Sequence, residues 1–219
     1  MIKRILEPEV MGSPEEAVAY DAMDHHEVNF QFVQDLIAAG CPPRGSVLDL
    51  GTGTAQIPIE LCRVLPEINV VGIDLSEEML LLAEKRIALS AFGKRIRLEN
   101  ADAKKIPDQV TQYDICVSNS IVHHIPAPVD IFSQAVRVTR AGGLFFWRDL
   151  VRPDSDVELQ HLVQTYAGQE NEHQKRLFAD SLYAALRLEE VQSLVADLDF
   201  DPASVTRTSD RHWTWSAIK

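Results

Sequence analysis

An apolar run that ends in an acid and is followed by two glycines is the clearest binding signal in this chain of 219 residues. Residues 46–50 read as a strand with Asp49 near its end, and Gly51, Thr52 and Gly53 follow directly. Glycine lets a ligand approach the backbone closely, and free N–H groups at the start of the next helix can bind polar groups. The pattern therefore predicts a ligand over the carboxyl end of a strand.

The loop differs from two common phosphate-binding loops. A dinucleotide fingerprint reads GxGxxG, but Gln56 stands at the third glycine position. A P-loop would need Gly-Lys-Ser or Gly-Lys-Thr, and neither follows. A nicotinamide-dependent oxidoreductase is therefore the less favoured alternative.

Further polar residues end the next strand-like runs. Asp74 and Asp102 close the second and third runs, and Asn119 and Ser120 lie at the end of the fourth. Ligands of open α/β sheets bind at the carboxyl ends of the strands, so these residues are candidates for the same site. For each acid, capping of a following helix is the alternative role.

Two adjacent histidines, His123 and His124, follow the fourth run. A neutral imidazole is a suitable general base if a bound acceptor must lose a proton, while packing or helix capping is the alternative. A second pair, His25 and His26, could be combined with them and Asp149 into a metal site. No HxxxH spacing supports such a site, so we predict no metal.

Five strand-like runs alternate with longer segments of helical periodicity, which predicts repeated βαβ units on a parallel sheet. The predicted strands are residues 46–50, 69–74, 96–99, 113–118 and 143–149. A turn is expected at residues 141–143.

Two segments lie outside this pattern. We expect residues 1–44 to form a helical lid on a cofactor-binding core at residues 45–150, followed by a helical insertion at residues 151–200. Residues 201–219 alternate like the two strands of a terminal antiparallel hairpin. The whole of residues 1–219 is expected to be a single domain.

Composition excludes several classes of protein. The formal net charge of -12 disfavours a nucleic acid partner. No stretch has the length of a membrane span or the pattern of a signal peptide, so we expect a cytoplasmic protein, as a monomer or homodimer. Cys41, Cys62 and Cys116 are widely spaced and are expected to be reduced, buried thiols.

Four motifs in this order resemble the class I S-adenosylmethionine-dependent methyltransferases, and more closely the small-molecule enzymes of the ubiquinone/menaquinone biosynthesis type. The motifs are residues 47–55, 71–76, 100–103 and 113–120. The resemblance implies a doubly wound, Rossmann-like α/β sheet of seven strands, mainly parallel with an antiparallel last strand. It also implies methyl transfer from S-adenosylmethionine to O, C or N of a small-molecule acceptor. A non-catalytic protein that binds the same cofactor is the alternative.

The resemblance also implies roles for individual residues. The glycine loop and Asp49 would hold the methionine end of the cofactor, and Asp74 would accept hydrogen bonds from the ribose hydroxyls. Asp102 and Ala103 would contact the adenine amino group and ring. The remaining expected contacts are Leu75 and Met79 on the adenine face, Asn119 and Ser120 near the methionine amine and the methyl group, and Tyr20 over the sulfonium.

Overall fold

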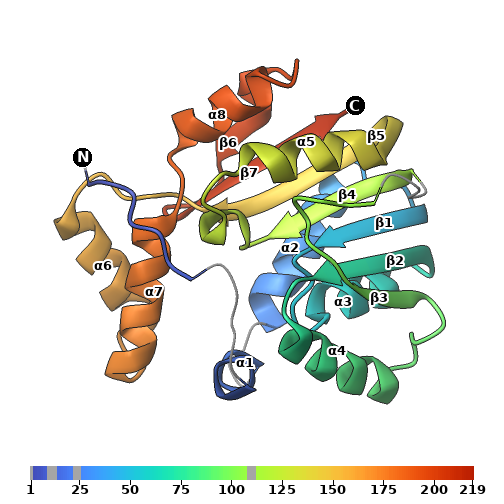
Figure 1. The fold of residues 1–219 in the computed structure, drawn as a ribbon, viewed down its shortest axis with the longest axis horizontal. Helices are drawn as coiled ribbons and strands as arrows, with labels where there is room; N and C mark the ends of the chain where they lie inside the picture. Colours follow the sequence, from blue (N-terminus) through green and yellow to red (C-terminus); the bar gives the residue numbers. More distant parts are fainter. Residues whose placement is uncertain (1, 9–13, 22–25, 108–111) are drawn as a thin grey trace. The chain divides into compact units, whose positions relative to one another are not determined.

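The computed structural model describes residues 2–8, 14–21, 26–107 and 112–219 and shows an α/β fold on one mixed sheet (Figure 1). The strand order is β3-β2-β1-β4-β5-β7-β6. Strand β1 pairs in parallel with β2 and β4, and β2 with β3, whereas β6 and β7 are antiparallel. The predicted seven-stranded, Rossmann-like sheet is thus confirmed. The strands are β1 (Arg44–Leu50), β2 (Glu67–Asp74), β3 (Ile96–Asn100), β4 (Tyr113–Asn119), β5 (Thr139–Leu150), β6 (Val205–Arg207) and β7 (His212–Ile218).

The chain forms two compact units. The first comprises Met1–Glu9, Asn119–Val129 and Arg148–Trp215, and the second comprises Val10–Ser118, Asp130–Trp147 and Ser216–Lys219. The helices are α1 (Pro14–Asp21), α2 (His26–Ala38), α3 (Gln56–Val64), α4 (Glu77–Leu89), α5 (Val129–Val138), α6 (Asp156–Ala167), α7 (Glu172–Ala184) and α8 (Leu188–Ala196), with short 3-10 turns η1 (Val122–His124) and η2 (Pro202–Ser204).

Strand β1 forms the centre of the second unit. It lies between β2 and β4, and its last four residues are all buried. Parallel strands covered on both faces read as continuous apolar runs. Asp49 is the exception in this run and is only 2% exposed, so its burial needs a compensating function or partner.

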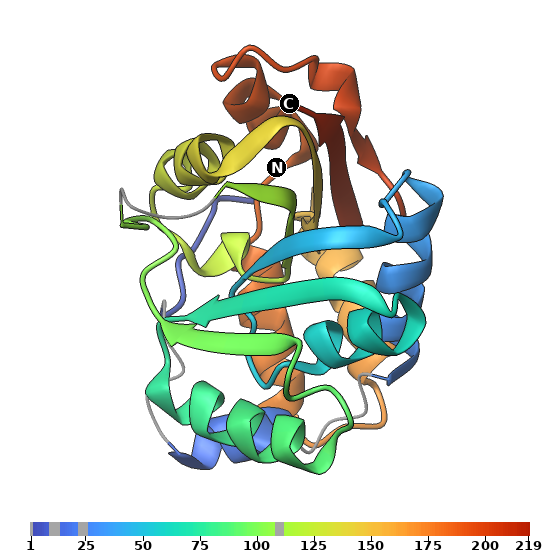
Figure 2. The ribbon, with the colours of Figure 1, turned by 90° about the vertical axis from the view of Figure 1, so that its right-hand side faces the viewer.

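Helix α2 packs one face into the hydrophobic core of the second unit. Its Phe32, Val33 and Leu36 are fully buried. The rings of Phe32 and Phe146 pack edge to face with centroids 5.2 Å apart. By contrast, α1 lies beside α4 (Figures 1 and 2), where Asp21 and Arg86 form an ion pair.

The first unit contains the three helices expected after the fifth strand, namely α6, α7 and α8. Its N-terminal segment runs along α7, where Ile5 N–H donates to the Tyr183 carbonyl at 3.1 Å. Residues 205–207 and 213–215 pair in antiparallel register, which confirms the predicted hairpin.

The turn predicted at residues 141–143 is wrong as an element boundary. These residues lie inside β5, which begins at Thr139 immediately after α5. Gly142 has a φ of 76°, which L side chains rarely adopt, so the strand bends there without ending. Gly142 N–H and the Gly143 carbonyl both bond the backbone of Lys219.

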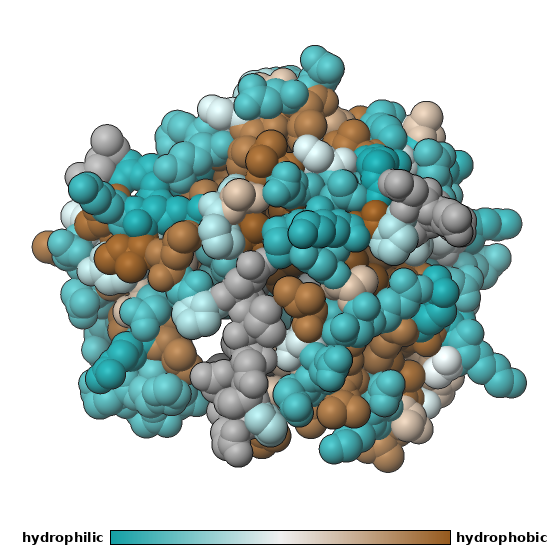
Figure 3. All heavy atoms as spheres, in the orientation of Figure 1, coloured by the Kyte–Doolittle hydropathy of each residue, from teal (hydrophilic) through white to brown (hydrophobic). Residues whose placement is uncertain are grey.

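The cysteines match expectation, because Cys41, Cys62 and Cys116 are all free and buried. Among the described residues no helix has the length and apolar character of a membrane span. Hydrophilic side chains are spread over the face in Figure 3, between smaller hydrophobic groups.

Candidate functional site

The glycine loop follows β1 in a conformation that requires its glycines. Gly51 and Gly53 have φ values of 72° and 53°, in the left-handed region where a Cβ is disfavoured. Gly51 N–H and Thr52 N–H both donate to the Ile73 carbonyl, each at 2.9 Å. The loop is therefore fixed to the end of β2 before any ligand binds.

Asp49 is held inside this loop. Its Oδ2 accepts a hydrogen bond from Thr52 Oγ1 at 2.7 Å. Burial raises the pKa of Asp49 to about 7, and the charge of Asp74 adds to the effect, while the Thr52 bond opposes it. The Thr52 hydroxyl is neutral and leaves the charge of the buried carboxylate uncompensated, so a cationic ligand group beside Asp49 would be stabilised.

Gly72 is a residue of this site that the sequence reasoning missed. A Cβ at position 72 would lie 2.5 Å from Thr52 Oγ1, so only glycine leaves room for the Thr52 side chain. The valines around Gly72 in β2 gave no sign of this requirement, because Thr52 reaches it from the neighbouring strand end.

Asp74 joins the glycine loop to the start of α4. Its Oδ2 accepts from Gly53 N–H at 2.8 Å, and its Oδ1 accepts from Ser76 N–H at 2.9 Å. Burial raises the pKa of Asp74, against these backbone bonds. Asp74 thus takes part in the turn into α4, and each of its oxygens retains capacity for a further donor.

Leu75 and Met79 differ in exposure. Leu75 is 41% exposed and free to cover a planar ligand group, whereas Met79 is 6% exposed and packs mainly in the core. Met79 N–H bonds Ser76 Oγ at 3.3 Å, so Ser76 caps α4 as its Ser-Glu-Glu sequence predicts.

Asp102 lies two residues beyond the end of β3, which closes at Asn100 rather than at the acid. Its Oδ1 accepts from Lys104 N–H and pairs with Lys104 Nζ, both at 2.9 Å. Burial opposes ionisation of Asp102, but the Lys104 contacts outweigh it and lower its pKa. Ala103 is partly exposed. Asn100, another residue that was missed, donates from Nδ2 to the carbonyls of Asp74 and Leu75.

Three other expected contacts are Asn119, Ser120 and Tyr20. Asn119 and Ser120 belong to the first unit, where Ser120 has a φ of 59° and donates its N–H to the Arg148 carbonyl at 2.9 Å. A serine in this region is strained, a property that is common at functional sites. Tyr20 lies in α1, but its side chain is outside the described residues, as is the whole of His25.

In the first unit, His123 is paired with a buried carboxylate. Its Nδ1 lies 2.5 Å from Asp149 Oδ1, and their side chains are 4% and 1% exposed. Asp149 Oδ2 also accepts from Val122 N–H at 2.6 Å. Burial alone would lower the pKa of His123, but Asp149 and then Glu7 raise it.

Glu7 completes a group that we call the histidine cluster, made of Glu7, His123, His124 and Asp149. Glu7 Oε1 lies 3.4 Å from His123 Nε2 and 3.1 Å from His124 Nδ1. Burial raises the pKa of Glu7, whereas burial and the charge of His123 lower the pKa of His124 to about 3. Ser181 Oγ donates to Glu7 Oε2 at 3.3 Å.

Arg4 fastens the N-terminal segment beside this cluster. Its Nε donates to the Ala184 carbonyl at 2.7 Å, and one terminal nitrogen donates to the carbonyls of His123 and Ile125 at 3.1 and 2.9 Å. Sequence reasoning missed both Arg4 and Glu7. No local motif marks them, because their partners lie more than a hundred residues away.

Comparisons with known proteins decide the family. The family model described as "Methyltransferase domain" matches residues 43–203. The chain belongs to this methyltransferase family. The methyltransferase resemblance of the four motifs is thereby confirmed.

Individual relatives of the chain are distant. It is 26% identical over 189 residues to 27-O-demethylrifamycin SV methyltransferase of Amycolatopsis mediterranei, covering 84% of this chain and 65% of the relative. It is 30% identical over 128 residues to a ubiquinone/menaquinone biosynthesis C-methyltransferase of Desulfotalea psychrophila, covering 58% and 50%. The chain thus spans about half to two thirds of the length of these curated relatives.

The fold of the chain also occurs in solved structures. The plantazolicin methyltransferase BpumL, in complex with a triazolic desmethylPZN analog and SAH, superposes with a TM-score of 0.72 at 16% identity. The match covers 94% of this chain and 92% of that one.

Proposed function

We propose that this protein transfers a methyl group from S-adenosylmethionine to an oxygen, carbon or nitrogen atom of a small molecule. The hydrogen bond from Gly53 N–H to Asp74 is the observation that carries the proposal. It fixes a carboxylate beside a glycine loop, in a chain of the methyltransferase family. S-adenosylmethionine would supply an electrophilic methyl group on a sulfonium.

The methionine end would bind at the glycine loop. Asp49 would face the ammonium group directly or through water, since a buried carboxylate gains most from a cationic partner. Gly51, Thr52 and Gly53 would admit the ligand to the backbone.

The nucleoside end would bind between Asp74 and the segment after β3. Asp74 would accept hydrogen bonds from both ribose hydroxyls with the capacity that Gly53 and Ser76 leave free. Leu75 would cover the adenine face, with Met79 behind it in the core. Asp102 would accept the adenine amino group, and Ala103 N–H would contact the ring.

Three further residues complete the proposed cofactor contacts. Asn119 would offer its carbonyl oxygen near the methionine amine and the methyl group, and Ser120 would line the same turn. Tyr20 would place its ring near the sulfonium, where an aromatic face favours a cation.

Transfer from a sulfonium is an in-line displacement that depends chiefly on positioning and desolvation. A base is needed only where the acceptor must lose a proton, and we assign that role to His123 and His124. Asp149 holds Nδ1 of His123, so Nε2 would accept the proton. His124, with its lowered pKa, would be the weaker base.

The acceptor is proposed to be a small molecule because one named relative is a methyltransferase of 27-O-demethylrifamycin SV and the other a C-methyltransferase of ubiquinone/menaquinone biosynthesis. The formal net charge of -12 supports a non-nucleic-acid acceptor. A cytoplasmic location and a monomer or homodimer complete the proposal.

Calorimetric titration of the full chain with S-adenosylmethionine, its demethylated product, NAD and NADP tests the proposal. We expect micromolar binding of the first two and none of the nicotinamides. Binding of NAD or NADP alone would instead indicate an oxidoreductase.

Methyl transfer itself needs a second measurement. Incubation with methyl-labelled cofactor and fractionated small metabolites should yield a labelled product. Binding without label in any fraction would favour a non-catalytic cofactor-binding protein.

A further inference from the structure

We propose that Glu7, His123 and His124 bind one divalent transition metal ion of the zinc type, with Asp149 as the residue that orients His123. This site goes beyond methyl transfer and lies wholly within the first unit. It also reverses our expectation from sequence that the chain holds no metal.

The three candidate ligand atoms have a spacing that suits tetrahedral coordination. Glu7 Oε1 lies 3.4 Å from His123 Nε2 and 3.1 Å from His124 Nδ1, and all three atoms lie within 4.8 Å of one another. Zinc bonds to nitrogen and oxygen of 2.0–2.1 Å place tetrahedral ligands about 3.3 Å apart. The two distances from Glu7 Oε1 match this spacing.

Asp149 supplies the outer contact that metal-binding histidines usually make. Its Oδ1 lies 2.5 Å from His123 Nδ1, which directs the Nε2 lone pair toward Glu7. Backbone N–H groups of Val122 and Leu150 hold this carboxylate, each at 2.6 Å. A carboxylate–histidine pair of this kind orients the ring and makes it a stronger ligand.

Two atoms of the site are buried without a protein partner of good geometry. Among the described residues, Glu7 Oε1 and His124 Nδ1 make no hydrogen bond although both are shielded from solvent. Leaving buried polar atoms unpaired is costly. A metal ion would satisfy both atoms at once.

The donor set selects the class of ion. Two imidazoles and one carboxylate suit zinc and its first-row neighbours, whereas magnesium and calcium prefer oxygen ligands. The Glu7 and His124 side chains are 11% and 21% exposed, so the site lies near the surface of its unit.

The ion and a proton compete for Nε2 of His123. A metal bound there would occupy the lone pair that the proposed general base uses. His123 can therefore either bind the metal ion or act as the general base, but not both at once. Metal binding and methyl transfer can be measured separately.

The test uses the full chain without a histidine tag, treated with a chelator and then titrated with zinc chloride in a calorimeter. We expect one zinc ion per chain in the wild type. We expect affinity at least a hundredfold weaker in Glu7→Gln and His124→Asn, and ten- to a hundredfold weaker in Asp149→Asn. Cobalt(II) should give the intense visible bands of a four-coordinate site in the wild type and not in Glu7→Gln or His124→Asn.

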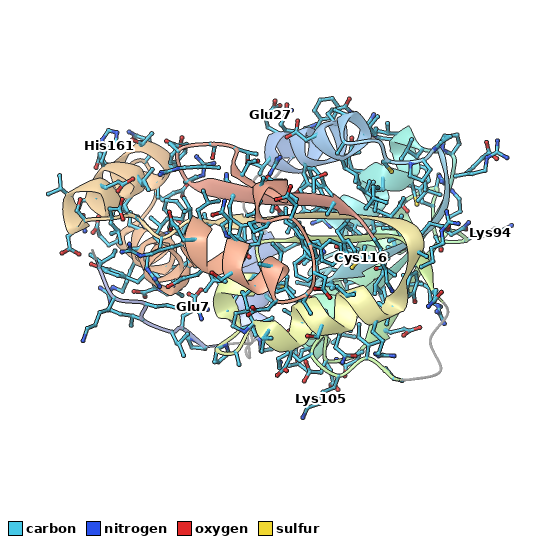
Figure 4. All side chains as sticks on the ribbon, turned by 90° about the horizontal axis from the view of Figure 1, so that it is seen from above. Glu7, Glu27, Lys94, Lys105, Cys116 and His161 are labelled. Atoms are coloured by element: carbon cyan, nitrogen blue, oxygen red, sulfur yellow. The ribbon has the colours of Figure 1, made fainter. Side chains whose placement is uncertain are left out.

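His161→Gln is the matched control, because His161 is an exposed histidine on α6, away from Glu7 in Figure 4. It should bind zinc as the wild type does. Glu7→His should still bind the metal, with cobalt bands shifted from those of the wild type. This result would show that Glu7→Gln loses a metal ligand and not a contact needed for folding.

Two outcomes would overturn the site. One is wild-type affinity in a folded Glu7→Gln or His124→Asn protein, judged by circular dichroism. The other is a wild type that binds zinc no better than these variants do, which would leave the cluster as an ion-pair network. Cofactor binding, measured separately on the same samples, reports on the proposed function and not on the metal.

Discussion

The glycine-loop site and the histidine cluster are built in opposite ways. The first draws Asp49, Gly51, Thr52 and Gly53 from one stretch of chain and adds Asp74, 21 residues from Gly53. The second gathers residues from three distant segments, with Glu7 more than a hundred residues from its partners. A substitution in the glycine-loop site should change ligand contacts while the backbone stays in place. A substitution in the histidine cluster removes an interaction that holds distant segments together.

The largest expected effect lies in the histidine cluster. Asp149→Ala should lower the free energy of unfolding by about 3–5 kcal/mol, because it leaves the buried His123 and Val122 N–H without their partner. Urea denaturation measures this loss. Asp197→Ala, at the exposed end of α8, should change stability by less than about 0.5 kcal/mol. An equally small effect of Asp149→Ala would remove the contrast between the two sites.

Substitution in the glycine-loop site should affect binding more than stability. Asp74→Ala should weaken S-adenosylmethionine binding by about 2–3 kcal/mol, or about 30- to 150-fold, through loss of hydrogen bonds to a charged acceptor. Calorimetry gives the affinity, and circular dichroism checks the fold. Glu84→Gln, exposed on the same helix α4 that Asp74 precedes, is the control. Unchanged affinity would refute the ribose contact.

The pH dependence of cofactor binding sharpens the comparison further. The pKa of Asp49 is about 7 in the free protein, and the ionised form would bind the ammonium group. Below pH 7 binding must release a proton, so affinity should fall by about 25-fold from pH 7.5 to 5.5 and level off above pH 8. Asp49→Asn should bind more weakly and flatten the profile. A wild-type profile without this slope would argue against Asp49 as the ammonium contact.

The smallest effect is expected at a purely local contact. Ser76→Ala removes the cap of α4 and should lower stability by about 1 kcal/mol. Thermal or urea unfolding measures it, with the exposed Ser193→Ala on α8 expected to cost less. A loss as large as that of Asp149→Ala would show that the start of α4 depends on more than its cap.

Sequence patterns predicted the contacts that lie within a few residues of one another. The apolar run of β1 and the glycine loop after it were predicted from local rules. The alternation of strands and helices predicted parallel βαβ units, and the family resemblance implied the seven-stranded sheet. Asp102 was placed two residues too close to its strand, since strand ends depend on pairing with a neighbour.

Several features that the sequence did not predict depend on residues far away in the chain. Helix α2 has the periodicity of any amphipathic helix, and only its packing against Phe146 makes it a core element. Gly72 is required by Thr52, which reaches it from the next strand. The glycines of β5 read as a turn, but backbone bonds to Lys219 keep them in the sheet.

The sequence by itself determined the α/β class, the glycine loop with its acids, and the methyltransferase resemblance, because each depends on spacing along the chain. Only the tertiary structure decided that Glu7 joins His123, His124 and Asp149. No pattern of residue types predicts the contact of Glu7 with the histidines. It depends on the path of the N-terminal segment along α7 and on the hydrogen bonds of Arg4 that hold the segment there.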